Sequence, residues 1–243
     1  MIKTKKKLII FMPFIGGGGV EKNLFLIANF LSKKLDKVKI CTITNKSKKK
    51  FDNSINFICP KKKYSENLNI RIKYIICLYE LYKYLKKNKD SVVLSFQANI
   101  YCIIVCKILG IKIIVRSNSS PSGWYHNFFK KLIYKKIISL ANKVIVNSTD
   151  FKKQMTNEFK IKVENIFNPL NIDEIKKKSK EKVNYNFSNK RFNVINIGRL
   201  TEQKDQITIL KSVNQLKNKV NVKLLIIGSG SERNNLDTYI KKK

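Results

Sequence analysis

Metal-ligand residues are scarce in this sequence. Histidine occurs once, at His126, and none of the five cysteines forms a Cys-x-x-Cys pair. Metal sites and disulfide frameworks both need clusters of such residues, so we expect neither a metal nor a disulfide. Cys77, Cys102 and Cys106 stand among apolar neighbours, where a thiol behaves as a small buried hydrophobic residue. Unpaired thiols of this kind are typical of a reducing compartment, and we expect a cytoplasmic location.

Long apolar runs are also missing. A membrane-spanning helix needs about 20 consecutive apolar residues, and the longest candidate, 100–115, is interrupted by Lys107, Gly110 and Lys112. The basic residues 5–7 and the apolar run 8–14 imitate a signal peptide, but four glycines follow and no cleavage site of small residues. We therefore expect neither a transmembrane helix nor a secretory signal.

Acidic residues are few, 16 against 51 lysines and arginines, which gives a formal net charge of +35. Such a charge attracts polyanions. Only five of the basic residues are arginines, and the lysines are spread along the chain, whereas nucleic-acid readers favour clustered arginine. We expect a lysine-rich solvated surface produced by biased codon usage, or attraction to an anionic membrane, and we do not expect sequence-specific binding of nucleic acid.

Short runs rich in isoleucine and valine alternate with longer amphipathic segments. This alternation requires crossover connections and predicts an α/β fold with a parallel, doubly wound sheet. The runs predict strands over 8–12, 38–43, 55–58, 92–96, 111–115 and 144–146. The amphipathic segments predict helices over 20–35, 68–87, 100–109, 127–140 and 150–159.

The alternation stops after a short run over 163–167 and begins again near residue 193. The residues between are polar, rich in lysine and poorly periodic, as in a linker. We expect an N-terminal Rossmann-like domain over 1–172, a linker over 173–190 and an incomplete second domain over 191–243. That second domain has predicted strands over 193–197 and 222–227 and predicted helices over 205–216 and 232–240. Two strand–helix pairs bury little core, so we expect a fragment or a partner that completes the domain.

Glycines follow the first predicted strand, at Gly16, Gly17, Gly18 and Gly19. A glycine turn before a helix lets a phosphate approach the backbone N–H groups and the positive end of the helix dipole. The turn is no P-loop, because no Gly-Lys-Ser/Thr follows. It also fails the dinucleotide fingerprint, because Glu21 stands where the third glycine belongs, and this argues against a nicotinamide enzyme.

A second group of candidates follows the strand predicted over 193–197. Gly198 and Arg199 come directly after it, and Lys204 lies near the start of the next helix. Two cations at a helix N-terminus can hold a diphosphate and stabilise its charge as a leaving group, without a metal ion. Gly228 and Gly230 follow the next strand at the same edge of the sheet, where open α/β sheets bind ligands. Read from spacing alone, these residues could equally be surface cations and a simple turn.

Together the segments resemble glycosyltransferase family 4. The resemblance lies in P-F-I-G-G-G-G-V-E at 13–21, I-G-R-L-T-E-Q-K at 197–204 and L-L-I-I-G-S-G-S-E-R at 224–233, in the family's order. V-N-S at 146–148 and N-I-F-N-P-L at 165–170 are also similar to that family, so the resemblance covers essentially the whole chain. It departs from the family in lacking the acidic E-x7-E motif, which we expect beyond Lys243.

The resemblance implies a GT-B-like architecture, in which the N-terminal domain holds the acceptor and the C-terminal domain binds the nucleotide-sugar. It also implies retaining sugar transfer from a nucleotide-sugar, expected to be a UDP-sugar, to a glycan or polyprenyl-linked acceptor of surface polysaccharide or lipopolysaccharide synthesis. No cofactor is implied. The glycine turn would face the donor diphosphate, and Arg199 and Lys204 would grip it. Gly198, Gly228 and Gly230 would also bind the donor. Arg116 resembles a catalytic-site position, but it could also orient the acceptor or lie on the surface, and Asn118 competes for that place. As given, the chain is expected to bind acceptor and to transfer little or nothing.

One predicted helix leaves a choice open. Residues 127–143 place aromatic and aliphatic residues on one stripe and lysine pairs beside it, as an interfacial helix does. The same stripe would serve a helix that packs on the sheet. If the helix is interfacial, the protein is expected to bind peripherally to the inner face of the cell membrane. The alternative function is a non-catalytic basic Rossmann-like module that binds anionic membrane or nucleic acid.

Overall fold

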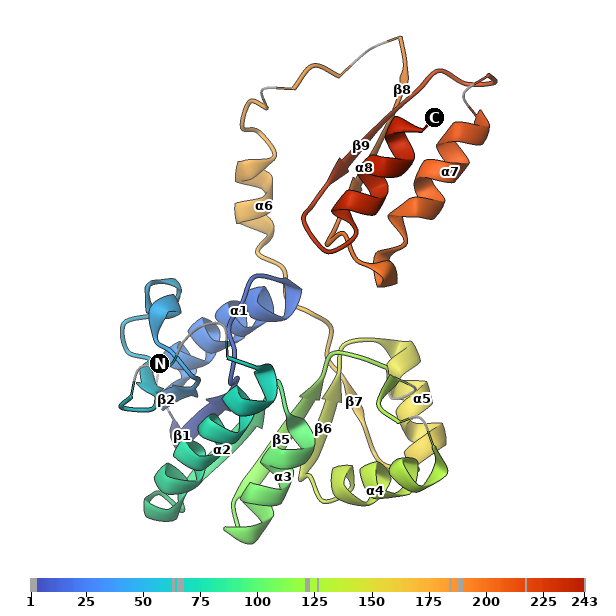
Figure 1. The fold of residues 1–243 in the computed structure, drawn as a ribbon. Coiled ribbons are helices and arrows are strands. Elements are labelled where there is room, and N and C mark those ends of the chain that lie inside the picture. The colour runs from blue at the N-terminus through green and yellow to red at the C-terminus, as the bar shows by residue number, and fades with distance from the viewer. Residues whose placement is uncertain are drawn as a thin grey trace. The chain divides into compact units, whose positions relative to one another are not determined.

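The computed structural model describes residues 4–62, 64, 68–120, 123–125, 127–183, 185–187, 190–216 and 218–242. The chain divides into two compact units, Met1–Ile175 and Lys176–Lys243 (Figure 1). The division falls inside the segment predicted as a linker, of which residues 184, 188 and 189 lie outside the described residues, as does His126.

The first unit contains a seven-stranded sheet in the order β3-β2-β1-β4-β5-β6-β7, with all neighbouring strands parallel. Its strands are β1 (Thr4–Phe11), β2 (Leu35–Cys41), β3 (Asn56–Ile58), β4 (Ser91–Ser95), β5 (Lys112–Ser117), β6 (Lys143–Val146) and β7 (Glu164–Asn165). Its helices are α1 (Gly19–Lys34), α2 (Ile70–Lys87), α3 (Asn99–Ile108), α4 (Phe128–Ile138), α5 (Thr149–Phe159) and α6 (Ile172–Lys178), which crosses the division between the units. After β1, the strands β2 and β3 are added toward one edge of the sheet. From β4 onward, β5, β6 and β7 are added toward the other edge, so the direction of strand addition reverses between β1 and β4.

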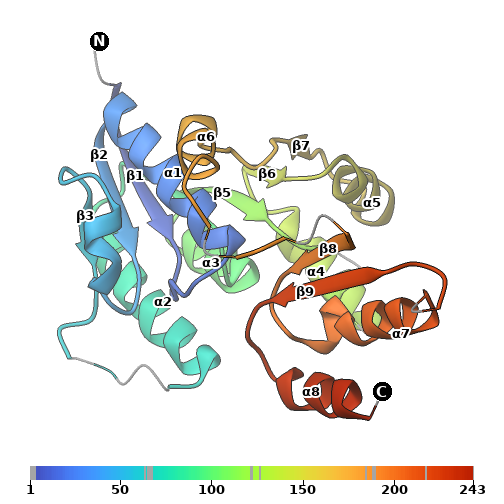
Figure 2. The same ribbon diagram turned by 90° about the horizontal axis from the view of Figure 1, so that it is seen from above.

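Each face of this sheet has its own hydrophobic core. Alternate residues of β1 point to opposite faces, so Ile9 and Phe11 enter one cluster while Leu8 and Ile10 enter the other. The first cluster takes its helical residues from α2, α3, α4 and α5, and the second takes them from α1. Figures 1 and 2 show α1 on one side of the sheet and α2 and α3 on the other. The strands are therefore covered on both faces, as their nearly continuous apolar runs predict.

The predicted α/β fold with a doubly wound parallel sheet is confirmed. The strands and helices expected in the first unit are present, with bounds that differ by a few residues. The sequence interpretation missed a 3-10 helix over Lys46–Lys50 and the short α6, both rich in lysine and without buried residues. Periodicity gives no signal for a short helix that buries nothing, and α6 lies in a segment that we expected to be an irregular linker.

The second unit contains a two-stranded parallel sheet and two longer helices. Its strands are β8 (Phe192–Ile197) and β9 (Val222–Ile227), and its helices are α7 (Gln206–Leu216) and α8 (Arg233–Lys241). Among its described residues, the buried hydrophobic side chains are those of Leu200 and Leu236. Phe192, Ile195 and Ile197 of β8 are exposed. The core within this unit is small, as expected from two strand–helix pairs.

All five cysteines are free, and Cys41, Cys77, Cys102 and Cys106 are buried, as predicted for three of them. Burial raises the pKa of Cys77 to about 12 and that of the half-buried Cys59 to about 11. These thiols therefore stay protonated near neutral pH and pack as apolar groups. Of the helices in the described part of the chain, none combines the length and the apolar character needed to cross a bilayer.

Candidate functional site

The glycine turn joins β1 to α1 at the carboxyl edge of the sheet, beside the point where the strand order reverses. The N-cap residue of α1 is Gly18, which has no side chain to accept hydrogen bonds from the first turn. The backbone N–H groups of that turn therefore remain available to a ligand. Gly17 and Gly19 are exposed, and a side chain at either would meet no atom within 4 Å. At Gly16 a Cβ would lie 2.9 Å from the ring of Phe14, so a side chain there would require that ring to shift.

A carboxylate already faces this turn. The Glu21 side chain in the first turn of α1 folds back, with Oε2 3.0 Å from the place of a Cβ on Gly18 and Oε1 3.7 Å from that on Gly16. A negative group is favourable there because it faces the positive end of the helix dipole. A phosphate binding at the same turn would meet this charge, so the carboxylate has to swing away first.

The segment before the turn is held firmly. The carbonyl oxygen of Pro13 accepts hydrogen bonds from the Ile43 N–H at 3.0 Å and the Thr42 hydroxyl at 3.3 Å. The Phe14 N–H donates to Gln97 Oε1 at 3.4 Å. The ammonium of Lys73, a buried lysine of α2, lies 4.3 Å from the centre of the Phe14 ring, a cation–π distance. The turn therefore leaves the sheet in a fixed direction.

The second unit brings its predicted residues together in two adjoining loops. After β8, the N–H of Leu200 donates to the Ser229 carbonyl at 2.9 Å, and the N–H of Glu232 donates to the Leu200 carbonyl at 3.0 Å. A Cβ on Gly228 would overlap the carbonyl oxygen of Gly198. Gly230 has φ +159 and a Cβ there would overlap the Leu200 carbonyl. Gly228 and Gly230 are thus glycines because the loop after β8 passes directly against them.

Arg199 and Lys204 lie on the loop so held. The carbonyl of Arg199 accepts from the buried side chain of Gln206, the first residue of α7, at 2.9 Å. Lys204 ends a 3-10 helix over Glu202–Lys204, two residues before α7 begins. Both side chains are exposed, and neither has a hydrogen-bond or ion-pair partner among the described residues. Two unpaired cations therefore stand ahead of the N-terminus of α7.

Arg116 lies at the end of β5 and is buried, so it is not a surface residue. Its Nη2 donates to Asn168 Oδ1 at 2.8 Å and to the Ile166 carbonyl at 3.3 Å. Burial lowers the pKa of its guanidinium. Among the described residues, the hydrogen bonds of its guanidinium are to the chain after β7, and its role in catalysis stays a prediction.

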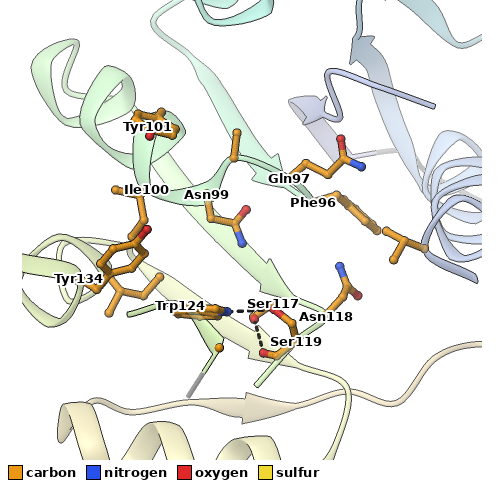
Figure 3. Close-up of a pocket in the computed structure, with 14 residues that line it drawn as sticks. Phe96, Gln97, Asn99, Ile100, Tyr101, Ser117, Asn118, Ser119, Trp124 and Tyr134 are labelled. Carbon is orange, nitrogen blue, oxygen red and sulfur yellow. Dashed lines mark hydrogen bonds between the residues drawn. The ribbon is translucent and has the colours of Figure 1, made fainter. Parts of the chain in front are cut away.

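Asn118, its rival, lines a cavity of about 530 Å³ at the carboxyl ends of β4 and β5 (Figure 3). The floor and walls come from the loops after these strands, from α3 and α4, and from the first turn of α1. The lining residues are Val20, Phe96, Gln97, Ala98, Asn99, Ile100, Tyr101, Ser117, Asn118, Ser119, Gly123, Trp124, Tyr134 and Ile138. Val20 follows the glycine turn directly and Gln97 is bonded to Phe14, so the cavity adjoins that turn.

Sequence reasoning missed most of this cavity. Its polar residues include two groups at the ends of buried strands, Gln97 with Asn99 after β4 and Ser117 to Ser119 at the end of β5. Because the carboxyl ends of parallel strands share one edge of the sheet, this shared position was the available signal. The sequence interpretation used only Arg116 and Asn118 from these loops.

Comparisons with known proteins find similarity to glycosyltransferases. Residues 177–243 match the family model described as Glycosyl transferases group 1. The chain is also 32% identical over 184 residues to an uncharacterized glycosyltransferase, MJ1059, of Methanocaldococcus jannaschii. That alignment covers 68% of the chain and 45% of the relative, so the chain spans less than half the length of this relative.

Solved structures with the same fold cover nearly the whole chain. Anabaena HepE in complex with UDP and glucose is 11% identical with a TM-score of 0.68, covering 98% of this chain and 65% of that one. The lipopolysaccharide outer core galactosyltransferase WaaB is 18% identical with a TM-score of 0.62, and the match covers 98% of this chain and 64% of WaaB. TarM is 12% identical with a TM-score of 0.68, and the match covers 98% of this chain and 74% of TarM. These likenesses confirm a GT-B-like α/β fold.

Proposed function

We propose that the protein is a glycosyltransferase of family 4 that moves a sugar from a nucleotide-sugar donor to a glycan or polyprenyl-linked acceptor. The observation that carries the proposal is the pair Arg199 and Lys204, unpaired ahead of α7 within the segment that matches Glycosyl transferases group 1. Two cations on a fixed loop at a helix N-terminus suit a diphosphate leaving group. UDP is the proposed nucleotide, since HepE binds UDP in its complexes.

The chemistry proposed for this site is retaining and needs no metal ion. Arg199 and Lys204 would balance the charge that grows on the diphosphate as the glycosidic bond breaks. The departing phosphate oxygen would then accept the proton of the attacking hydroxyl. The turn at Gly16 to Gly19 would offer backbone N–H groups to a phosphate once the Glu21 carboxylate swings away.

Release of the nucleoside diphosphate tests the activity. Purified full-length protein is given UDP-glucose, UDP-galactose or UDP-N-acetylglucosamine together with a lipid-linked glycan extract. It is expected to release UDP and to label the glycan, with no need for Mg²⁺. A coupled UDP assay in the presence of a chelator measures this. Salt-dependent binding to random DNA without release of UDP from any donor would favour the alternative, a non-catalytic basic module.

We further propose that the protein works at the cytoplasmic face of an anionic membrane and docks through α4. The exposed fractions of Phe128 and Phe129 are 68% and 76%, and Leu132 and Ile133 are exposed beside them. The helix packs on the sheet through its other side, where Ile138 is buried. Packing therefore accounts for only part of its apolar residues. An apolar face flanked by lysines suits the headgroup region of an anionic bilayer.

Flotation with liposomes tests the docking helix. The parent protein is expected to float with vesicles containing phosphatidylglycerol at low salt. The double variant Phe128→Ser, Phe129→Ser is expected to stay mostly in the soluble fraction, because two large apolar side chains no longer enter the bilayer. Phe30→Ser is the matched control, because Phe30 is an exposed phenylalanine of α1, on the other face of the sheet. Equal flotation of all three proteins would remove α4 from the proposal.

A further inference from the structure

Arg116 carries a positive charge in the interior of the first unit. The residue is only 3% exposed, and burial lowers the pKa of its guanidinium, which still stays charged near neutral pH. None of the ion pairs within the described part of the chain includes it, so no carboxylate balances the charge. A buried charge without an opposite charge is costly. The hydrogen bonds of the guanidinium therefore have to account for this arginine.

These hydrogen bonds reach one short segment, the chain just after β7. Nη2 of Arg116 donates to Asn168 Oδ1 at 2.8 Å and to the Ile166 carbonyl at 3.3 Å, while the buried Nε has no partner among the described residues. Asn147, which follows β6, donates to the same Asn168 oxygen at 3.5 Å. Because the guanidinium is planar and rigid, two acceptors two residues apart fix both its direction and the course of the segment.

The backbone of Arg116 is itself held by a residue that lines the cavity. Nδ2 of Asn99 donates to the Arg116 carbonyl at 3.1 Å, and Oδ1 of Asn99 accepts from the Ser95 hydroxyl at 2.7 Å. A continuous row of contacts therefore crosses the carboxyl ends of β4 and β5 and ends on the chain after β7. Arg116 connects the edge of the cavity to that chain.

The segment that Arg116 holds has little else to fix its course. The last backbone hydrogen bond of this part is donated by Ile166 to the Val146 carbonyl at 2.9 Å. From residue 167 to residue 171, no backbone N–H group donates to another described residue. The regular pattern resumes in α6, and the division between the two units follows Ile175. The chain thus leaves the first unit through a stretch that the side chain of Arg116 ties to the sheet.

We infer that Arg116 is a positioning residue, whose guanidinium fixes the course of residues 166–168 and with it the direction in which the chain continues to the second unit. It acts through Asn168 and contacts neither donor nor acceptor. Its effect on turnover rests on the proposed function, with the acceptor held by the first unit and the diphosphate by the second. Sugar transfer needs both reactants in one geometry, and a displacement of about 1 Å can cost a hundredfold in rate. Loss of the tether therefore lowers turnover although no group at the reacting atoms is removed.

Three variants of the full-length protein test the tether by kinetics. Arg116→Met removes the donor and keeps a long side chain, Asn168→Ala removes the acceptor at an exposed position, and the third variant combines the two. Each is expected to lower kcat about tenfold, with no further loss in the combination, because both substitutions remove the same contact. The KM for the donor is expected to change less than about twofold, since Arg199 and Lys204 lie in the second unit. A catalytic arginine gives a large loss in Arg116→Met and a near-normal kcat in Asn168→Ala, and that result overturns the inference.

Amide hydrogen exchange tests the tether without any sugar transfer. The Ile166 amide, bonded to the Val146 carbonyl, is expected to exchange about tenfold faster in Arg116→Met and in Asn168→Ala than in the parent. Because Asn168 is exposed, its variants keep the core even if Arg116→Met fails to fold.

Two further variants serve as controls. Asn168→Asp keeps an acceptor oxygen and places an opposite charge on the guanidinium, so it is expected to retain the slow exchange and the kcat of the parent. Asn157→Ala, at an exposed asparagine of α5, is expected to change neither. Unchanged exchange in Asn168→Ala, or an equal loss in Asn168→Asp, overturns the inference. If the parent releases no UDP, the proposed function fails and the exchange alone decides on the tether.

Discussion

Replacing Arg199 or Lys204 by alanine in the full-length protein is expected to lower turnover by about a hundredfold or more, because removing one charge that stabilises a developing anion costs roughly 3 kcal/mol. Both side chains stand unpaired on a loop fixed by Gln206 and by the strand-end contacts of Leu200. The loop does not depend on either side chain, so the variants are expected to keep their fold. Steady-state release of UDP, measured over a range of donor concentrations, gives kcat and KM separately.

Whether each substitution changes kcat or KM identifies the role of that cation. A charge that acts only as the diphosphate departs lowers kcat, whereas one that mainly binds the ground state raises KM. Lys211→Ala is the matched control, since Lys211 is an exposed lysine of α7 in the same unit. Near-normal rates in both Arg199→Ala and Lys204→Ala would contradict the proposed site. A similar loss in Lys211→Ala would mean that only the general positive charge of the unit matters.

The course of the backbone was largely predictable from the sequence, and the directions of the side chains were not. β1 illustrates the first part, because its alternate apolar residues serve two cores and leave a strong periodic signal. Arg116 illustrates the second. Its position at the end of β5 suggested a site residue, but its guanidinium turns to the chain after β7, a contact about 50 residues along the sequence that no local pattern encodes.

The glycine-rich segments show the same limit in finer detail. Four consecutive glycines predicted an open turn for a phosphate, and at Gly17 and Gly19 the turn is open. The sequence also contained Glu21, but spacing alone did not reveal that its carboxylate folds back over Gly16 and Gly18. Conversely, Gly228 and Gly230 were assigned to donor binding on their position. The structure adds a reason that concerns packing, since a neighbouring loop occupies the space of their missing side chains.

The packing reason leads to the second large effect. Gly228→Ala is expected to destabilise the second unit by about 3 kcal/mol, because the new methyl group overlaps the Gly198 carbonyl and crowds Leu200, so that backbone has to move. Leu200 is one of two buried hydrophobic side chains among the described residues of this unit, and its N–H and carbonyl hold the two loops together. Few other contacts can compensate. Amide hydrogen exchange of β8 and β9, compared between variant and parent, measures the loss within this unit alone.

Gly198→Ala is the matched comparison, since it adds the same methyl group to the facing loop. There the nearest atom to the new Cβ is Gln206 Nε2 at 3.9 Å, an ordinary contact distance, and the expected change is within about 0.5 kcal/mol. Both substitutions remove a glycine from the same pair of loops, so a general demand for flexibility would affect them alike. Faster exchange in Gly228→Ala alone would identify close backbone approach as the cause, and equal exchange in the two variants would refute it. If close approach is the cause, turnover falls in Gly228→Ala as well, because the displaced loop is the one that carries Arg199 and Lys204.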